Sequence, residues 1–213
     1  MTLEHNTLVI DWAGTLTVPM HELFATAAHQ LGYGDDDIAV AFAGLAEYLL
    51  ADDSPVHRAE RGEIDDDDLR DFIDSKAPGV GRIFDPTGPS FLHGADRPEM
   101  TALLEDLIEA DVTVILATNN FRSAQEVLAT RYLESGLVSA LVNSALVGVR
   151  KPDPAFYLLC LEAAGVPAAE VVFLDDQERN LVPARELGMH TELVGTDATA
   201  AVAAARRLLL GSP

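Results

Sequence analysis

Short apolar runs and helical repeats of apolar residues divide this 213-residue chain into alternating elements. Runs with the length of buried strands predict strands at residues 7–10, 112–117, 140–143, 171–174 and 190–194. Apolar residues at three- and four-residue spacing predict helices at residues 98–110, 122–133, 154–165, 178–188 and 198–210. Because the strands alternate with helices through short connections, the pattern predicts a parallel sheet covered by helices on both faces.

This alternation is interrupted after the first strand. The next strand signal begins at residue 112, and the pattern between the two is helical, over residues 21–31, 38–50 and 66–73. Residues 77–94 are rich in glycine and proline, which predicts a linker. We therefore expect an α/β core formed by residues 1–17 and 93–213, with a small all-helical domain, residues 18–92, inserted into it.

Charge and cysteine content narrow the partners and the compartment. The formal net charge of −21 argues against nucleic acid and anionic membranes, because phosphate backbones attract a basic surface. No apolar run approaches the roughly 20 residues of a membrane span, and residues 1–6 do not resemble a signal peptide. The one cysteine, Cys160, lies in an apolar helical pattern and is expected to be a buried thiol. These features predict a cytoplasmic protein.

Polar residues gather where the expected strands end, which is the edge at which open parallel sheets hold their ligands. The first and fourth expected strands end in carboxylates, and the second ends in a small hydroxyl residue. Between the third and fourth strands, one of the chain's two lysines precedes a proline. Each feature alone is typical of a turn or a helix cap, whereas the ordered set is a strong signal. The residues that form it are Asp11, Thr118, Asn119, Lys151, Asp175, Asp176 and Asn180.

This set of side chains suits chemistry at phosphorus. An aspartate such as Asp11 can attack phosphorus and form an aspartyl-phosphate. Because two anions repel, a divalent metal has to bridge the nucleophile and the phosphoryl oxygen, and Asp11 and Asp175 offer the hard oxygen ligands that Mg²⁺ prefers. We expect Thr118 and Asn119 to donate to phosphoryl oxygens, and Lys151 to hold the nucleophile and the phosphoryl group together.

The four segments that carry these residues, around Asp11, Thr118, Lys151 and Asp175, resemble the four motifs of the haloacid dehalogenase-like hydrolases in order and spacing. The similarity covers nearly the whole chain. Residues 174–194 are most similar to the branch that contains the N-terminal phosphatase domain of soluble epoxide hydrolases. The resemblance implies a Rossmann-like core with a helical cap, and a small anionic phosphorylated substrate. It leaves a homodimer open. The implied metal site consists of Asp11, the backbone carbonyl of Ala13 and Asp175, with Asp176 and Asn180 orienting the metal shell.

Ala13 is the departure from the family's pattern. In the first motif, Asp-x-Asp-Gly-Thr, the second aspartate donates a proton to the leaving group, and alanine has no proton to donate. General acid catalysis is typically worth about 10²–10⁴-fold in rate. A phosphatase would therefore need a substitute acid, such as His21 or Glu22 at the start of the cap, or a leaving group that needs little protonation, as in acyl and aryl phosphates.

Two other interpretations stay open. Residues 11–15 closely resemble the first motif of phosphonoacetaldehyde hydrolases, which also have alanine at the second position. That C–P bond hydrolysis needs a cap lysine for a Schiff base, and the expected cap offers only Lys76. The chain would otherwise be a non-catalytic phosphate binder or an interaction protein on the same scaffold. A dehalogenase, which needs no metal, would leave the Asp175–Asp176 pair unexplained.

The cap is expected to close over the site and to select the substrate. Its candidate contacts with the substrate are Trp12 and His21, together with Phe24 and the residues around Tyr48. For Phe24 and Tyr48, packing in the core is the stronger expectation. The sequence thus predicts Mg²⁺-dependent hydrolysis at phosphorus through Asp11.

Overall fold

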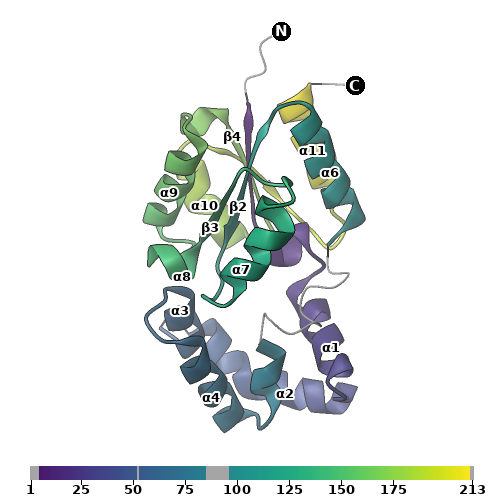
Figure 1. Cartoon of the computed structure of the whole chain (residues 1–213), viewed down its shortest axis with the longest axis vertical. Helices are drawn as coiled ribbons and strands as arrows, with labels where there is room; N and C mark the ends of the chain where they lie inside the picture. The colour runs from purple at the N-terminus through teal and green to yellow at the C-terminus, as the bar shows by residue number, and fades with distance from the viewer. Residues whose placement is uncertain (1–4, 52, 85–95, 212–213) are drawn as a thin grey trace.

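The computed structural model describes residues 5–51, 53–84 and 96–211, without the side chains of residues 42, 45–50 and 84 (Figure 1). The predicted boundary between residues 92 and 93 and the side chain of Tyr48 therefore lie outside the described part. Within that part, no helix is both long enough and apolar enough to cross a membrane.

A five-stranded parallel sheet forms the centre of the core. Its strands are β1 (Thr7–Ile10), β2 (Thr113–Thr118), β3 (Ala140–Asn143), β4 (Val171–Asp175) and β5 (His190–Leu193), in the order β3-β2-β1-β4-β5. Ile10, the last residue of β1, lies opposite Leu116 of β2 and Leu174 of β4. Because β1 is the central strand, the residue that follows it emerges between the ends of two other strands. The predicted parallel α/β sheet is confirmed.

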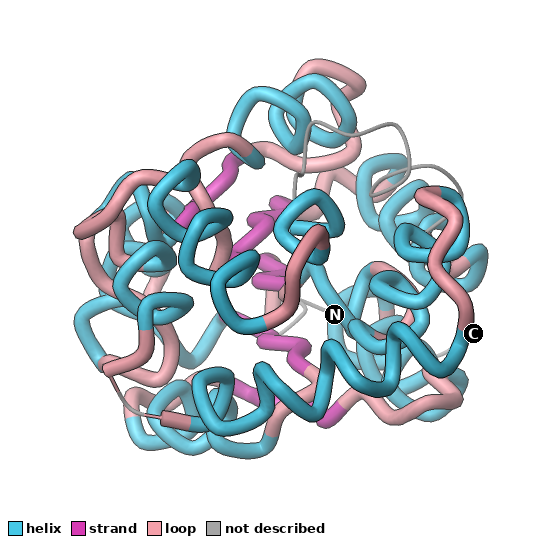
Figure 2. The backbone as a smooth tube through the Cα atoms, turned by 90° about the horizontal axis from the view of Figure 1, so that it is seen from below, coloured by secondary structure: helices cyan, strands magenta, loops and turns pink. Residues whose placement is uncertain are grey.

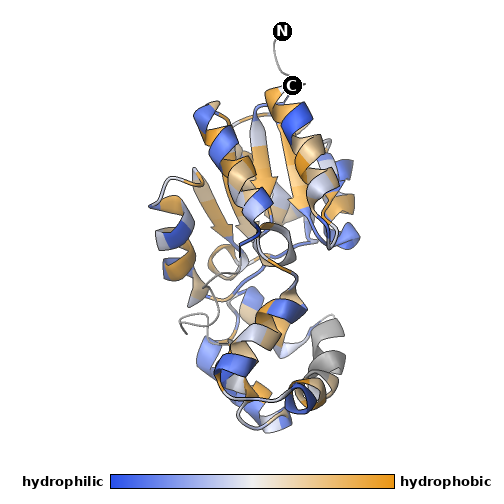
Figure 3. Cartoon of the chain, turned by 90° about the vertical axis from the view of Figure 1, so that its right-hand side faces the viewer, coloured by the Kyte–Doolittle hydropathy of each residue, from blue (hydrophilic) through white to orange (hydrophobic). Residues whose placement is uncertain are grey.

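Helices cover both faces of the sheet, as Figure 2 shows along the strand direction. On one face, Leu8 and Ile10 belong to a hydrophobic cluster with residues of α6 (Pro98–Glu109), α7 (Ala124–Leu128) and α11 (Thr199–Leu210). On the other face, Val9 packs with residues of α9 (Pro154–Ala164) and α10 (Glu178–Glu186). Side chains alternate between the two faces of a strand, so a strand covered on both sides is largely apolar, and the strands of the sheet are mostly orange in Figure 3.

The α9 helix also shows how local sequence signals set its ends. Asp153 caps its first turn by accepting from the amide of Ala155 at 2.9 Å, and Gly165 ends it in the left-handed conformation. Cys160 on this helix is a free, buried thiol, as predicted.

A helical cap follows β1 and lies against the carboxyl edge of the sheet (Figure 1). The predicted helices are present as α1 (Met20–Gln30), α2 (Asp35–Leu50) and α4 (Asp66–Lys76). A short α3 (Pro55–Glu60) was not predicted, although Ser54 accepts from the amide of His57 and proline occupies the first helical position. The expected linker begins with a further short helix, η2 (Val80–Phe84).

Short elements complete the core. The predicted helix 122–133 is divided into α7 and the π-helical η3 (Ala129–Leu133). The remaining elements are η1 (Trp12–Leu16), α8 (Ser144–Val147) and η4 (Ala168–Glu170). Contacts between cap and core include Arg122 Nη2 donating to the Gly62 carbonyl at 3.2 Å and the Ser123 amide donating to Asp66 Oδ2 at 2.7 Å.

Candidate active site

Asp11 leaves the end of β1 between β2 and β4, and its amide donates to the Leu174 carbonyl at 2.9 Å. The buried Lys151 ammonium lies 2.6 Å from Asp11 Oδ1 and 2.7 Å from Asp175 Oδ2, and donates to the Ala117 carbonyl at 3.0 Å. The structure thus brings together residues from the first, third and fourth motifs, as the sequence predicted. Charge-assisted contacts of this length fix the orientation of all three side chains.

The turn after Asp11 requires glycine and is held by a buried arginine. Gly14 has a φ of +86°, and a Cβ atom there would lie 2.6 Å from Asp176 Oδ2. Arg97 donates to the carbonyls of Gly14 at 2.8 Å and Thr17 at 2.9 Å, and also to those of Gly195 and Thr196. One guanidinium therefore joins the Asp11 turn to the segment that follows β5.

Asp175 at the end of β4 accepts hydrogen bonds on both oxygens. Asn180 Nδ2 lies 2.9 Å from Oδ1 and 3.1 Å from Oδ2, and the amide of Gln177 donates to Oδ1 at 2.8 Å. Lys151 also donates to Oδ2, so each oxygen of this fully buried carboxylate accepts two hydrogen bonds. The predicted role of Asn180 in orienting the shell of a metal ion stays a prediction.

Burial sets the electrostatics of the acidic cluster. It raises the pKa of Asp11 to about 7, with Asp175 and Asp176 adding to the rise and Lys151 opposing it. Burial and the neighbouring Asp175 raise the pKa of Asp176 to about 6. Burial also disfavours the charge on Lys151, but Asp11 and Asp175 outweigh it and raise the pKa of the ammonium, which stays charged.

These carboxylates fit a divalent cation. Asp11, Asp175 and Asp176 each offer an oxygen, and the three oxygens lie within 4.8 Å of one another. Asp176 Oδ1 is buried without a hydrogen-bond partner among the described residues. Three acidic groups this close resist ionisation together, and a hard cation with oxygen ligands would relieve the repulsion. The Ala13 side chain is half-buried, and its backbone carbonyl, predicted as a ligand together with Asp11 and Asp175, stays a prediction.

The second motif lies beside Lys151. Thr118 is fully buried at the end of β2, and its hydroxyl makes only a long hydrogen bond, 3.5 Å, to the Asn119 carbonyl among the described residues. Asn119 uses its side-chain amide on the backbone of Lys151, with Nδ2 donating at 3.0 Å and Oδ1 accepting at 2.8 Å. The predicted phosphoryl contact is therefore left to the Thr118 hydroxyl, while the Asn119 side chain is already engaged.

A cavity of about 160 Å³ lies over Asp11, between cap and core. The sequence did not predict His57, Glu60, Arg150 or Arg179 as part of it. The two cap residues were missed because α3 was not recognised. The arginines flank recognised motifs, but only the fold shows which way they face. The described lining residues are Asp11, Ala13, Met20, Val56, His57, Glu60, Asn119, Arg150, Lys151, Gln177, Arg179 and Asn180.

Two predicted substrate contacts lie elsewhere. Trp12 is buried in the core, where its Nε1 donates to the Tyr132 hydroxyl at 3.0 Å. His21, like the alternative acid Glu22, is exposed on α1, because that helix buries the face that carries Leu23 and Phe24. None of these residues lines the described part of the cavity. Packing in the core, expected for Phe24, is confirmed.

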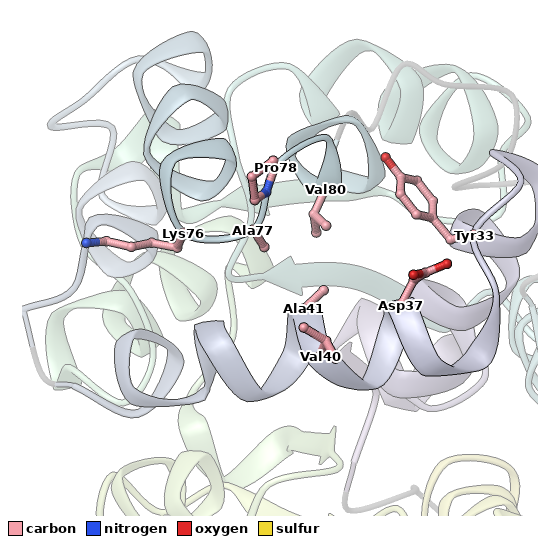
Figure 4. A pocket seen from close by; sticks show the side chains of 8 residues that line it. All are labelled: Tyr33, Asp37, Val40, Ala41, Lys76, Ala77, Pro78 and Val80. Carbon is pink, nitrogen blue, oxygen red and sulfur yellow. The ribbon is translucent and has the colours of Figure 1, made fainter.

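A second, larger cavity of about 340 Å³ lies inside the cap (Figure 4). Lys76 lines it together with Tyr33 and Asp37, and none of its described lining residues is shared with the cavity over Asp11. The only cap lysine thus borders a different cavity from the one over the acidic cluster, and its ammonium points away from the other labelled side chains (Figure 4).

Comparisons with known proteins show which family the chain resembles. A model of the haloacid dehalogenase-like hydrolases matches residues 5–188. The sesquiterpene phosphatase astK of Aspergillus oryzae is 35% identical over 136 residues, which are 61% of this chain and 67% of that protein. Bifunctional epoxide hydrolase 2 of Rattus norvegicus is 39% identical over 109 residues, covering 49% of this chain but only 20% of that protein.

Among solved structures, a haloacid dehalogenase family enzyme from Bacteroides thetaiotaomicron has a TM-score of 0.67 at 22% identity, covering 91% of this chain and 96% of that one. That structure is described as a complex with magnesium and inorganic phosphate. The likeness at this identity concerns the fold.

Proposed function

Because the chain belongs to the haloacid dehalogenase-like hydrolases, we propose that it is a Mg²⁺-dependent phosphatase that acts through Asp11 on a small phosphorylated metabolite. The observation that carries this proposal is the Lys151 ammonium held between Asp11 and Asp175 inside a cluster of three carboxylates. A phosphatase named among the relatives, and magnesium with phosphate in a related fold, support the same chemistry.

In the proposed reaction, a carboxylate oxygen of Asp11 attacks phosphorus and the bond to the leaving oxygen breaks. Water then attacks the aspartyl-phosphate, which releases phosphate and restores the carboxylate. Asp11, Asp175 and the Ala13 carbonyl would hold the cation, with Asp176 and Asn180 orienting them. When bound, Mg²⁺ would supply positive charge against the phosphoryl oxygens. Lys151 would add a fixed charge, and the buried Thr118 hydroxyl would donate to the same group.

The absence of a general acid at position 13 narrows the range of substrates that the enzyme could hydrolyse. We propose that the leaving group needs little protonation, as in aryl or acyl phosphates, or receives its proton from another side chain. His57 is the one histidine among the described residues that line the cavity, and it is buried there. It is therefore a better candidate than the exposed His21 for a substitute acid.

Cleavage of a C–P bond is disfavoured by the position of Lys76. The phosphonoacetaldehyde hydrolase chemistry implied by the first motif needs a lysine that reaches the substrate. Lys76 lines the other cavity, and Lys151, which does line the Asp11 cavity, is engaged by two carboxylates.

The decisive experiment measures phosphate release with and without Mg²⁺ across aryl, acyl and sugar phosphates and phosphonoacetaldehyde. Wild type is compared with Asp11→Asn and with Asp68→Asn, a control on an exposed aspartate of α4. We expect Mg²⁺-dependent release that Asp11→Asn abolishes and Asp68→Asn retains. Undiminished release by Asp11→Asn would refute the nucleophile assignment. If no substrate of the panel releases phosphate although Mg²⁺ still binds, the result would favour a binding role for the site.

A further inference from the structure

Arginines gather where the cap meets the core, in a chain whose net charge is −21. Arg150 and Arg179 line the cavity over Asp11. Burial lowers the pKa of Arg150, the neighbouring Glu60 opposes this fall, and the like charges of Arg179 and Arg61 lower the pKa further. Arg179 and Arg61 are thus each close enough to Arg150 to disfavour its charge.

Carboxylates of the protein neutralise these three arginines to different extents. Arg61 is paired with Asp53 at 2.7 Å and with Glu63 at 2.6 Å. Arg150 Nε lies 2.6 Å from Glu60 Oε2, but the two atoms are not aligned as a hydrogen bond. No carboxylate of the described residues pairs with Arg179.

Arg179 is held beside the cavity rather than neutralised. Its Nε donates to Gln177 Oε1 at 2.8 Å, and Gln177 also lines the cavity. The two terminal nitrogens of the guanidinium have no hydrogen-bond partner among the described residues. Arg179 also stands in the first turn of α10, where the helix dipole disfavours positive charge. Arg179 is exposed, so water solvates these nitrogens, and its guanidinium stands unneutralised at the cavity lining where a ligand can reach it.

The phosphoryl group does not account for these arginines. Lys151 already supplies the buried cation next to Asp11 and Asp175. Arg150 and Arg179 belong to the segments that follow β3 and β4, and they line the same cavity as the cap residue Glu60, with which Arg150 is paired. The cavity therefore has one cationic centre for the reacting group and a second one toward the cap.

We propose that the substrate carries a second anionic group, a carboxylate or another phosphoryl group, which Arg179 binds with Arg150 while the reacting phosphoryl group lies at Asp11. This inference rests on the proposed phosphatase function and specifies its substrate class. A planar guanidinium recognises carboxylate and phosphate oxygens through two parallel hydrogen bonds. The second site would orient the substrate and discriminate against uncharged phosphate esters.

Binding of non-hydrolysable phosphonates in saturating Mg²⁺ tests this proposal by calorimetry at constant ionic strength. The probes are phosphonoacetate, 3-phosphonopropionate and 4-phosphonobutyrate, each compared with the methyl-, ethyl- or propylphosphonate that lacks its carboxylate. The three chain lengths vary the separation between the phosphonate and the carboxylate. We expect at least one carboxylated probe to bind about tenfold more tightly than its partner, the gain typical of one charge-assisted contact.

Two variants locate the effect. Arg179→Gln should abolish the preference and leave the affinity for the alkylphosphonates unchanged. Arg185→Gln is the matched control, because Arg185 lies on the same helix but pairs with Glu178 outside the cavity lining. Equal affinities within every pair, or a preference that survives in Arg179→Gln, would overturn the second anion site alone. Failure of wild type to bind any phosphonate would count against the phosphoryl site, and so against both proposals.

Discussion

Asn119 holds the backbone of Lys151 on both sides of the residue. Its Nδ2 donates to the Lys151 carbonyl at 3.0 Å, and its Oδ1 accepts from the Lys151 amide at 2.8 Å. The side-chain amide therefore joins the end of β2 to the loop that carries the buried ammonium. This is the work of a positioning residue, whereas the sequence had predicted a contact with the phosphoryl group.

Replacing Asn119 with alanine should reduce turnover, because Lys151 would no longer be held in position. The variant loses two hydrogen bonds, each worth about 0.5–1.5 kcal/mol, and frees the loop to move. A displacement of 1 Å in a catalytic group can cost about 10²-fold in rate, so we expect kcat to fall by that order with a smaller change in KM. Steady-state kinetics would show this split. Asn6→Ala, which removes an exposed contact with Glu170, is the control and should leave kcat unchanged.

Removal of the Lys151 charge should destabilise the fold. In Lys151→Met, Asp11 and Asp175 would face each other without the cation that lies 2.6 and 2.7 Å from them. Breaking a buried ion pair on one side typically costs about 3–5 kcal/mol. We expect a clear fall in Tm, and a larger rise in Tm on addition of Mg²⁺ than wild type shows, because the metal would replace part of the lost charge.

The exposed Lys76 serves as the control for that experiment. Lys76→Met removes the same charge from the cap and should leave the Mg²⁺ dependence of Tm as in wild type. An unchanged Tm in Lys151→Met would show that the ammonium does not stabilise the acidic cluster.

The core could be predicted from the sequence because its strands are buried on both faces. A strand such as β4 has no polar face, so it appears as a continuous apolar run, and its length is read directly. The cap was predicted less completely. Its α3 has only six residues, too few for a helical repeat to show, and its capping serine and proline were the only local signals.

The residues of the candidate site also differ in how far the sequence predicted them. Asp11 and Asp175 were found because a residue that ends a central parallel strand has to reach the carboxyl edge of the sheet. Trp12 stands next to Asp11 in the sequence, yet its ring turns into the core toward Tyr132. The direction of a side chain in a tight turn depends on what packs against it, and so does the convergence of His57 with Arg179. These relationships are set by the fold.

Cys160 should be inert in the folded protein. Burial raises the pKa of its thiol to about 12, and the thiolate is the reactive form. We expect no reaction with a disulfide reagent such as DTNB at neutral pH in the native state, and release of one equivalent after unfolding in guanidinium chloride, since the chain has one cysteine. Rapid labelling under native conditions would show that α9 opens readily or that the thiol is accessible.

Restoring an acid at position 13 should change which substrates are hydrolysed. Ala13 lines the cavity beside Asp11, so the carboxyl group of Ala13→Asp would stand beside the reacting group. General acid catalysis is worth about 10²–10⁴-fold, and alkyl phosphates, whose leaving groups are poor, should gain most of it while aryl phosphates gain little. Ala13→Asn matches the shape without the proton and should give no such gain. Equal rates for the two variants on alkyl phosphates, with Mg²⁺ binding intact, would mean that protonation of the leaving group does not limit this enzyme.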